Sequence, residues 1–539
     1  MLYSKKTNTE QIMNIRIPDR ITLIYEGGVA EKISSSTLKE KDISLSCVIT
    51  EGKTLKVSVK ADTTPLSYIT LRWSFADGDI PSGFTKVLGD EWERAYGTME
   101  WRSINPDIFM PWYFFITDSS DDKPSEFRRT CAFGVRVRPN SLCYWNLDGA
   151  GATLWLDVRC GGSGVVLGGR TLEAVTVVFG DYRNITAFEA GQQFCRSMCD
   201  DGIFPKTPVY GSNNWYYAYG NSSHEEILRD ASIVADATKG LKNRPFMVID
   251  DGWQPYNCDG PWHCGNQKFP DMKKLAEEIT AMEVKPGIWI RFLADVRKES
   301  PGVKEDWRLS RDNSFLDPSH PEVIEHVKED TRRIVSWGYK LIKHDYSTFD
   351  MFGAWGMNRL RSIAGDENNW SFYDRSRTSA EIVLDFYRAI REAAGDALII
   401  GCNTISHLCA GLVEINRTGD DTSGKEWLRT RKLGVNTLAF RMSQHNIFYT
   451  VDADCVGITE LVPWEKNRLW LKALALSGSP LFVSCKPGVL NEEQEKELAE
   501  AFAVNSVQTD TLIPLDWIET TCPQKWLHNG KAIKIPWFE

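Results

Sequence analysis

The sequence of 539 residues predicts an N-terminal β-sandwich, followed by a (β/α)8 barrel and a short C-terminal β segment. A chain of this length is too long to fold around one ordinary hydrophobic core, so it should fold as several domains. Short alternating runs fill its first part, whereas apolar runs separated by helical stretches fill its middle. We expect the sandwich at 1–185, a linker helix at 186–204, the barrel at 205–485 and the C-terminal segment at 486–539.

The sandwich is predicted from short runs in which β-branched or aromatic residues alternate with polar ones between turn residues. These runs are ITLIYEGG (21–28), KTLKVSVKADTT (53–64), YITLRWSFADGD (68–79), WYFFITDSSDD (112–122), TCAFGVRVRPNS (130–141), ATLWLDVRCGG (152–162) and EAVTVVFGD (173–181). The next stretch, 186–198, changes to helical periodicity and would connect the sandwich to the following domain.

The barrel is predicted from eight largely apolar runs, which are typical of buried parallel strands. They are VYGSNNWYY (209–217), RPFMVIDDGW (244–253), KPGIWIRF (285–292), YKLIKHDY (339–346), ALIIGCN (397–403), GLVEINR (411–417), NIFYTVDAD (446–454) and SPLFVSC (479–485). The gap between Asn403 and Gly411 is too short for a full helix. After 485, one helix at 491–503 and strand-like runs at 510–517 and 531–538 can form only a small β segment.

The composition favours a neutral or polar small substrate. A formal net charge of −10 with 25% charged residues argues against capture of nucleic acid or of an anionic membrane surface. The sequence has no apolar run of membrane-spanning length and no secretory signal. Its 13 scattered cysteines predict free thiols in a reducing compartment, hence a cytoplasmic protein. No cofactor or metal ion is expected, and the oligomeric state is left open, a homo-oligomer included.

Polar residues gather at the ends of four predicted barrel strands, where barrel enzymes carry their catalytic groups. They are Asp250, Asp251, Lys343, Asp345, Arg417, Asp420, Asp421, Asp452 and Asp454. Carboxylates gathered at one mouth repel one another unless cations compensate, and Lys343 and Arg417 are the candidates for that.

Two of these positions suit hydrolysis of a glycosidic bond with retention of configuration. The reaction needs an ionised carboxylate as nucleophile and a protonated carboxyl as proton donor. Asp345, close to a lysine in the sequence, should stay ionised and serve as the nucleophile. The crowded pair Asp420 and Asp421 suits the acid, and the spacing by itself does not choose between them.

Several motifs together resemble glycoside hydrolase families 27 and 36. They are GSNNW (211–215), MVIDDGW (247–253), YKLIKHD (339–345), NRTGDD (416–421), VDAD (451–454) and LALSGSPLFVS (474–484), and they follow one another in the families' order. The resemblance implies an α-galactosidase-like enzyme in which Asp345 is the nucleophile and Asp421, rather than Asp420, is the acid/base. An N-terminal sandwich is also a feature of family 36.

The resemblance further implies a set of substrate contacts. Asp250 and Asp251 would bind sugar hydroxyls, and a lysine at a barrel mouth needs a partner, which makes Lys343 a ligand candidate. Arg417 is either a ligand or a clamp on neighbouring carboxylates. Tryptophans are usually core residues, but two lie beside motifs. The full predicted substrate-binding set is Asp250, Asp251, Trp215, Trp253, Lys343, Cys402, Asn403, Arg417 and Asp454.

Two departures from family 36 leave the sugar open. The chain has Gly401-Cys402-Asn403-Thr404 where the family has Cys-Ser-Gly-Gly-Gly, and Arg291-Phe292 where a Glu-Pro is usual. The same fold could therefore act as an α-N-acetylgalactosaminidase, a β-L-arabinopyranosidase or a galactosyl transglycosidase. A carbohydrate-binding protein without catalysis is the alternative from another class. The plain structural alternatives are a helix cap for Asp250 or Asp251, a helix cap or a pair with Lys343 for Asp345, and a turn for Asp420 and Asp421.

Overall fold

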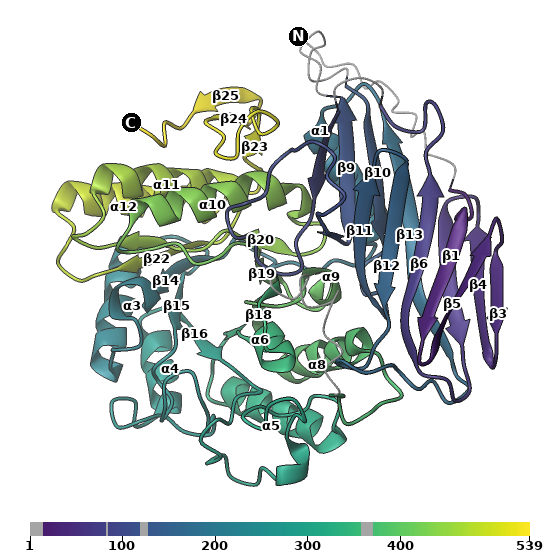
Figure 1. Ribbon diagram of the computed structural model, residues 1–539. Helices are drawn as coiled ribbons and strands as arrows, with labels where there is room; N and C mark the ends of the chain where they lie inside the picture. The colour runs from purple at the N-terminus through teal and green to yellow at the C-terminus, as the bar shows by residue number, and fades with distance from the viewer. Residues whose placement is uncertain (1–14, 82–84, 119–127, 357–369) are drawn as a thin grey trace. The chain divides into compact units, whose positions relative to one another are not determined.

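The structure is a computed structural model that describes residues 15–81, 85–118, 128–356 and 370–539. The chain forms two compact units, coloured by position along the sequence in Figure 1. Unit 1 holds the residues up to Asp90 together with Trp101–Arg159 and Gly164–Asp200. Unit 2 holds Asp201–Glu539 and two excursions from the N-terminal region, Glu91–Glu100 and Cys160–Ser163.

Unit 1 contains two antiparallel sheets with the strand orders β2-β1-β6-β12-β11-β8 and β3-β4-β5-β13-β10-β9-β7. The strands are β1 Arg20–Tyr25, β2 Gly28–Ile33, β3 Thr37–Glu40, β4 Ile43–Thr50, β5 Thr54–Lys60, β6 Leu66–Ser74, β7 Thr85–Gly89, β8 Met110–Pro111, β9 Tyr113–Asp118, β10 Thr130–Val135, β11 Leu142–Asp148, β12 Gly151–Asp157 and β13 Thr171–Tyr182.

Aromatic rings join the two sheets of unit 1. The ring of Trp73 on β6 lies 5.4 Å from that of Phe179 on β13, and Trp145 on β11 lies 5.5 Å from Phe114 on β9, between ring centres. Helix α1 (Ala187–Met198) follows β13 and begins at a capping box in which Thr186 and Glu189 satisfy each other's backbone amides. The predicted antiparallel sheets are thus present.

Unit 2 is built on one sheet of parallel strands with the order β20-β19-β18-β17-β16-β15-β14-β22-β21. The strands are β14 Tyr210–Asn213, β15 Phe246–Ile249, β16 Lys285–Ile290, β17 Leu341–His344, β18 Leu398–Gly401, β19 Ile415–Arg417, β20 Thr450–Asp452, β21 Val456–Ile458 and β22 Leu481–Cys485. Each of the eight predicted apolar runs contains one of these strands. Only β21 lies outside them.

Helices alternate with the parallel strands and surround them (Figure 1). They are α2 Trp215–Ala218, α3 His224–Ala237, α4 Met272–Ala281, α5 Pro321–Ser336, α6 Ser347–Phe352, α8 Ser379–Ala394, α9 Ser406–Cys409, α10 Trp427–Arg441, α11 Trp464–Ser477 and α12 Glu492–Asn505, with 3-10 turns at Glu305–Trp307 and Met442–Gln444. The short connection after β18 holds only the four-residue α9. A small antiparallel sheet, β23 Ile513–Pro514, β24 Lys525–His528 and β25 Lys531–Lys534, ends the chain.

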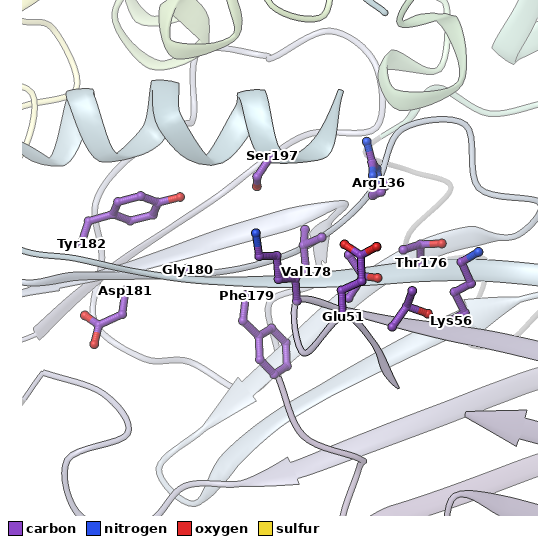
Figure 2. A pocket seen from close by; sticks show the side chains of 13 residues that line it. Glu51, Lys56, Arg136, Thr176, Val178, Phe179, Gly180, Asp181, Tyr182 and Ser197 are labelled. Carbon is purple, nitrogen blue, oxygen red and sulfur yellow. The ribbon is translucent and has the colours of Figure 1, made fainter. Parts of the chain in front are cut away.

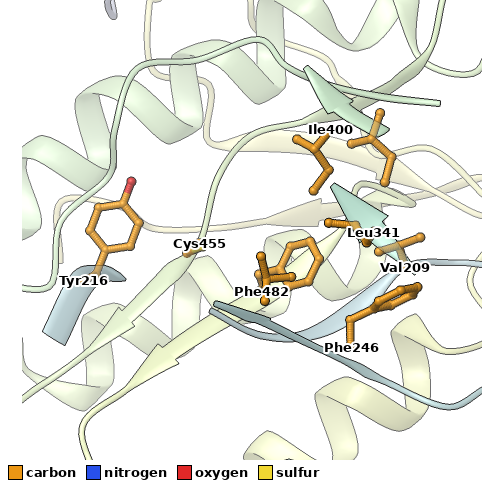
Figure 3. Close-up of a cluster of buried hydrophobic side chains, with 9 residues drawn as sticks. Val209, Tyr216, Phe246, Leu341, Ile400, Cys455 and Phe482 are labelled. Atoms are coloured by element: carbon orange, nitrogen blue, oxygen red, sulfur yellow. The ribbon is translucent and has the colours of Figure 1, made fainter. Parts of the chain in front are cut away.

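The parallel strands bury an apolar cluster on one face (Figure 3). Its members are Val209, Tyr216, Phe246, Val248, Leu341, Ile400, Ile415, Cys455 and Phe482. Most members lie within the strands: Phe246, Val248, Leu341, Ile400, Ile415 and Phe482. Because successive strand residues point to opposite faces, the residues two positions after each of these six point to the same side of the sheet. The cluster therefore forms the floor beneath the polar strand ends.

Two sequence-level expectations concern membranes and cysteines. Within the described ranges, no helix has both the length and the apolar character needed to cross a membrane. Each of the 13 cysteines is a free thiol, as expected.

Asp230 on α3 is a buried carboxyl outside the polar strand ends. It is 3% exposed, it accepts a hydrogen bond from the Tyr217 hydroxyl, and its Oδ1 has no partner within the described part of the chain. Burial raises the pKa of Asp230 to about 7, although the Tyr217 hydrogen bond opposes the shift. A carboxyl whose pKa is higher in the folded than in the unfolded state makes folding less favourable as it ionises.

We therefore predict that the free energy of unfolding falls as pH rises from about 4 to about 7, the interval between the unfolded and folded pKa values of this group. Asp230→Asn should remove this dependence and be up to roughly 4 kcal/mol more stable than the parent at pH 8. Urea denaturation at pH 5 and pH 8 measures both quantities. Asp236→Asn, at an exposed position of the same helix, is the control. An unchanged pH dependence in Asp230→Asn would contradict the prediction.

Candidate active site

The strand ends of unit 2 bring their polar residues together above the apolar cluster. Lys343 and Asp345 lie two and four residues after Leu341, Asp250 lies two residues after Val248, and Arg417 lies two residues after Ile415. Strand periodicity therefore directs these side chains to one side of the sheet. Asn213 and Trp289 reach the same region, because each contacts one of these aspartates.

Asp345 is held by donors from three strand ends. Its Oδ1 accepts from its neighbour's backbone amide, Tyr346 N, at 2.7 Å and from Asn403 Nδ2, and its Oδ2 accepts from Trp289 Nε1 at 3.1 Å. Tyr346 has a φ of 66°, a left-handed backbone conformation that is unusual for a bulky residue. The donors fix the orientation of the Asp345 carboxylate.

Asp250 and Lys343 form a buried ion pair, with Nζ 2.7 Å from Oδ2. Asn213 Nδ2 donates to the same carboxylate oxygen at 2.6 Å. Burial would lower the pKa of Lys343, but the charges of Asp250 and Asp345 outweigh it and hold that pKa well above the ordinary value. Lys343 is therefore a permanent cation between the two carboxylates.

Asp251 is engaged by the loop that follows β15. Its Oδ1 accepts from Gln254 Nε2 at 2.5 Å and from Cys258 N at 2.9 Å, and the Cys258 thiol lies 2.9 Å from Oδ2. Burial and the charge of Asp251 raise the pKa of Cys258 well above the usual thiol value, so this thiol stays protonated and donates. Asp251 therefore holds this loop together, and its predicted binding of sugar hydroxyls stays a prediction.

Arg417 is 3% exposed and joins two carboxylates. Nη1 lies 2.8 Å from Asp454 Oδ1, and Nη2 lies 2.8 Å from Asp421 Oδ1. Asp454 also accepts from the Tyr216 hydroxyl and from Thr422 N at 2.7 Å, so both of its carboxylate oxygens accept from protein donors. The clamp role considered for Arg417 is present in the structure, and Asp454 belongs to the support of the site.

The surroundings of Asp421 differ from those expected. Crowding by acids favours the pair Asp420 and Asp421 as proton donors, and the family resemblance favours Asp421, but Asp421 Oδ1 accepts from two arginines, Arg94 Nη1 at 3.0 Å and Arg417 Nη2 at 2.8 Å. Burial would raise the pKa of Asp421, yet the charges of Arg417, Arg94 and Lys343 outweigh it and hold that pKa well below the ordinary value. The carboxyl is therefore ionised at rest. Asp452, buried on β20, has its pKa raised to about 6.

Arg94 could not be recognised from the sequence. It lies in Glu91–Glu100, inside the region assigned to the sandwich, yet this segment belongs to unit 2. Its backbone pairs with the end of β19, because Ala95 N donates to Thr418 O at 2.7 Å and Asp420 N donates to Ala95 O at 2.9 Å. The only sequence signal is a cluster of charged and aromatic residues, EWERAY, outside the strand-like runs.

The tryptophans near the site differ in exposure. Trp253 is fully buried and its Nε1 donates to Trp289 O at 2.8 Å, so its ring offers no face to a sugar in this structure. Trp215 is half-buried and lies 5.6 Å from the Tyr219 ring. Trp289, which sequence reasoning left with the core, is the one that contacts Asp345.

Cys402 and Asn403 follow β18. Cys402 is 1% exposed, and burial together with the charge of Asp345 raises its thiol pKa well above the usual value, so it is a neutral wall residue. Asn403 adopts a φ of 60°, and its buried Oδ1 has no hydrogen-bond partner among the described residues. This oxygen is a free acceptor beside Asp345.

A metal centre and a cavity in unit 1 are the other kinds of site to weigh against the polar strand ends. In the parts of the chain that the structure describes, no group of three His, Cys, Asp or Glu side chains could hold a metal ion. A cavity of about 590 Å³ lies in unit 1 between β5, β13 and the end of α1 (Figure 2). Its carboxylates are Glu51 and Asp181, and Asp181 is already paired with Arg129 at 2.8 Å. It therefore lacks the pair of available carboxyls that the unit 2 site has.

No family model and no curated protein matches the sequence. Solved structures do match. α-Galactosidase TtGalA from Thermus thermophilus, in complex with p-nitrophenyl α-D-galactopyranoside, aligns over 93% of this chain and 99% of its own, with a TM-score of 0.62 and 16% identity. The chain has the fold of an α-galactosidase.

Two further structures support this fold. The family 36 α-galactosidase AgaA from Geobacillus stearothermophilus, in complex with stachyose, aligns over 92% of this chain and 73% of its own, with a TM-score of 0.56 and 13% identity. The galactosidase domain of AgaSK, an α-galactosidase–sucrose kinase, aligns over 92% and 71%, with a TM-score of 0.58 and 15% identity. The α-galactosidase fold predicted from the motifs is confirmed.

Proposed function

We propose that this chain is a retaining glycoside hydrolase that removes a terminal α-linked galactose, or a similar sugar, from an oligosaccharide or glycoside. The observation that carries the proposal is the placement of Asp345 after β17 and Asp421 after β19, on either side of β18 and both near Lys343, in a chain with an α-galactosidase fold. The solved neighbours were captured with p-nitrophenyl α-D-galactopyranoside and stachyose, which motivates the choice of substrate class.

We further infer that the parallel sheet of unit 2 closes as a (β/α)8 barrel. β20 pairs with β19, β21 pairs with β22, and only the three residues after Asp452 separate β20 from β21. Counting β20 and β21 as two halves of one interrupted strand gives eight strand positions. Asp454 lies at this interruption with a φ of 79°, where Arg417 holds its side chain.

The reaction would proceed by two displacements. Asp421, ionised at rest, first takes up a proton from solvent. A carboxylate oxygen of Asp345 then attacks the anomeric carbon, the bond to the leaving oxygen breaks, and Asp421 gives that proton to the leaving oxygen. In the second displacement Asp421 takes a proton from water, the water oxygen attacks the anomeric carbon, and Asp345 is released. Each displacement inverts the anomeric carbon, so the α configuration is retained.

The other chain residues would act on binding and orientation. Trp289, Asn403 and the Tyr346 amide hold Asp345 in one orientation, which reduces the reorganisation needed for attack. Asp250 and Lys343 offer an acceptor and a donor for sugar hydroxyls, and the free Oδ1 of Asn403 offers a further acceptor. The proposed binding set thus combines charged and neutral groups.

Asn403 also motivates a second candidate function. It stands in the segment that departs from family 36, so the same chemistry could serve another sugar or another acceptor. α-N-acetylgalactosaminidase, β-L-arabinopyranosidase and galactosyl transglycosidase activities are the alternatives of this kind. The choice among them depends on which hydroxyl or substituent meets Asn403.

A panel of p-nitrophenyl glycosides tests the proposal. The α-galactoside is expected to be hydrolysed at least tenfold faster than the α-N-acetylgalactosaminide, the β-L-arabinopyranoside and the β-galactoside, with proton NMR showing the α-sugar as first product. Faster release from another glycoside would change the sugar and keep the mechanism. Formation of the β-anomer first would refute double displacement, and sugar binding without any turnover would indicate a carbohydrate-binding protein.

A further inference from the structure

The segment Glu91–Glu100 carries an arginine to the carboxyl proposed as acid/base, in a position that none of the predicted motifs includes. Arg94 is 7% exposed, and its Nη1 lies 3.0 Å from Asp421 Oδ1 and 3.3 Å from Asp420 Oδ1. One nitrogen is therefore shared between two adjacent carboxylates. A buried guanidinium keeps its charge at any ordinary pH, so its position affects the pKa of the carboxyls beside it.

The backbone around Arg94 is firmly anchored. The carbonyl of Glu93 accepts from Arg441 Nη1 at 2.9 Å and from Ser406 Oγ at 3.1 Å. The Glu93 side chain accepts from Gly356 N at 3.0 Å and from the Tyr96 hydroxyl at 2.6 Å. Because these contacts hold Glu93 in place, the Arg94 side chain is the part of the 91–100 segment that can change partners.

The two carboxylates offer different alternatives to Arg94. Asp421 Oδ1 also accepts from Arg417, whereas its Oδ2 has no hydrogen bond within the described residues and its side chain is 37% exposed. Asp420 is additionally paired through Oδ2 with Arg429 Nη2 at 3.1 Å. Arg94 can thus stay paired with Asp420 while Asp421 gains or loses a proton on the exposed Oδ2.

Several charged or titratable groups face Asp421 from the surrounding elements. The cations are Arg94 from the 91–100 segment, Lys343 from β17, Arg417 from β19 and Arg429 from α10. The other groups are Asp420, Asp454 from the β20–β21 connection, and Tyr216 and Tyr219 from α2 and its C-cap. Arg417 is also committed to Asp454, and Lys343 to Asp250. Of Arg94, Arg417 and Lys343, Arg94 is the one that is shared with Asp420, the carboxylate next to Asp421 in the chain.

We propose that Arg94 is a positioning residue for Asp421: by sharing its guanidinium between Asp420 and Asp421 it directs Oδ2 toward the leaving group and limits the pH range in which Asp421 carries a proton. This inference rests on the proposed function. The proton comes from solvent, passes to the leaving oxygen in the first displacement, and is recovered from the attacking water in the second. Arg94 and Arg417 stay charged throughout.

Arg94→Met is the direct test, measured as the pH dependence of kcat/KM for p-nitrophenyl α-galactoside. Loss of a cation about 3 Å from a carboxyl raises the pH at which that carboxyl loses its proton by about one to three pH units. The alkaline limb should therefore move up by at least about one pH unit in Arg94→Met and by less than half as much in Arg94→Lys, which keeps the charge.

Two matched variants control for general charge effects and for misfolding. Arg429→Met removes a nearby cation that reaches the Asp421 backbone carbonyl but not its carboxylate, and its limb should move less than a third as far. Asp420→Asn removes the second partner of Arg94 and should move the limb in the opposite direction, to lower pH. This variant keeps Arg94, so it tests the proposal even if Arg94→Met does not fold.

A readout independent of activity separates this inference from the proposed function. Carbodiimide with an amine labels protonated carboxyls, and tandem mass spectrometry distinguishes Asp420 from Asp421. Labelling of Asp421 should extend to higher pH in Arg94→Met than in the parent. An active parent with unmoved limbs and labelling would overturn the role of Arg94 alone. An inactive parent with the expected labelling shift would overturn the proposed function and leave the electrostatic role of Arg94 supported.

Discussion

Asp345→Ala is expected to lower p-nitrophenyl α-galactoside turnover by at least about 10⁴-fold, because the covalent intermediate cannot form without the carboxylate. Sodium azide should restore part of the activity by entering the space that the side chain leaves. A single displacement by azide inverts the anomeric carbon, so the product should be the β-glycosyl azide, identified by proton NMR.

The companion variant Asp421→Ala distinguishes the two roles. Loss of the acid/base leaves the glycosyl-enzyme to be attacked by azide in a second inversion, so the α-glycosyl azide is expected. Asp236→Ala, on the exposed face of α3, should retain full activity and is the control. Undiminished turnover in Asp345→Ala, or the same azide anomer from both site variants, would refute the assignment.

Arg291→Met is expected to destabilise the protein by about 3–5 kcal/mol, because it leaves one partner of a buried ion pair uncompensated. Arg291 holds Asp350 through three hydrogen bonds of 2.6 to 3.1 Å, and their side chains are 8% and 1% exposed. Burial raises the pKa of Asp350 to about 6 even though the charge of Arg291 opposes the shift. The loss should therefore be larger at pH 8, where Asp350 must ionise, than at pH 5. Urea denaturation at both pH values measures it.

The double variant Arg291→Met with Asp350→Leu should recover most of the stability, since an apolar pair of similar volume avoids the buried charge. Arg388→Met breaks an exposed pair with Asp385, 52% and 39% exposed, and should cost less than about 1 kcal/mol. A loss in Arg291→Met no larger than in this control would contradict the prediction. Turnover should fall too, because the Arg291 guanidinium lies 4.2 Å from the ring centre of Tyr346, next to Asp345.

Strand-level features of this protein are determined by local sequence. The eight apolar runs predicted the parallel strands because buried strands require continuous apolar residues, and their last residues marked the polar strand ends. Lys343 and Asp345 follow from this pattern directly, since strand periodicity places both on the side of Leu341. Strand β21, which follows the seventh run after a break at Asp454, has no such signal, and at this break the Asp454 side chain is held by Arg417.

Only the tertiary structure decided which charges meet. In the sequence Asp420 stands beside Asp421, and crowding by this second carboxyl would raise the pKa of Asp421. The fold instead brings Arg94, more than 300 residues away, to Asp421 Oδ1, where its charge lowers that pKa. It also buries Trp253 and places Trp289 against Asp345. Periodicity fixes the face of the sheet to which a side chain points, but electrostatic interactions depend on distances across the fold, which a linear pattern does not contain.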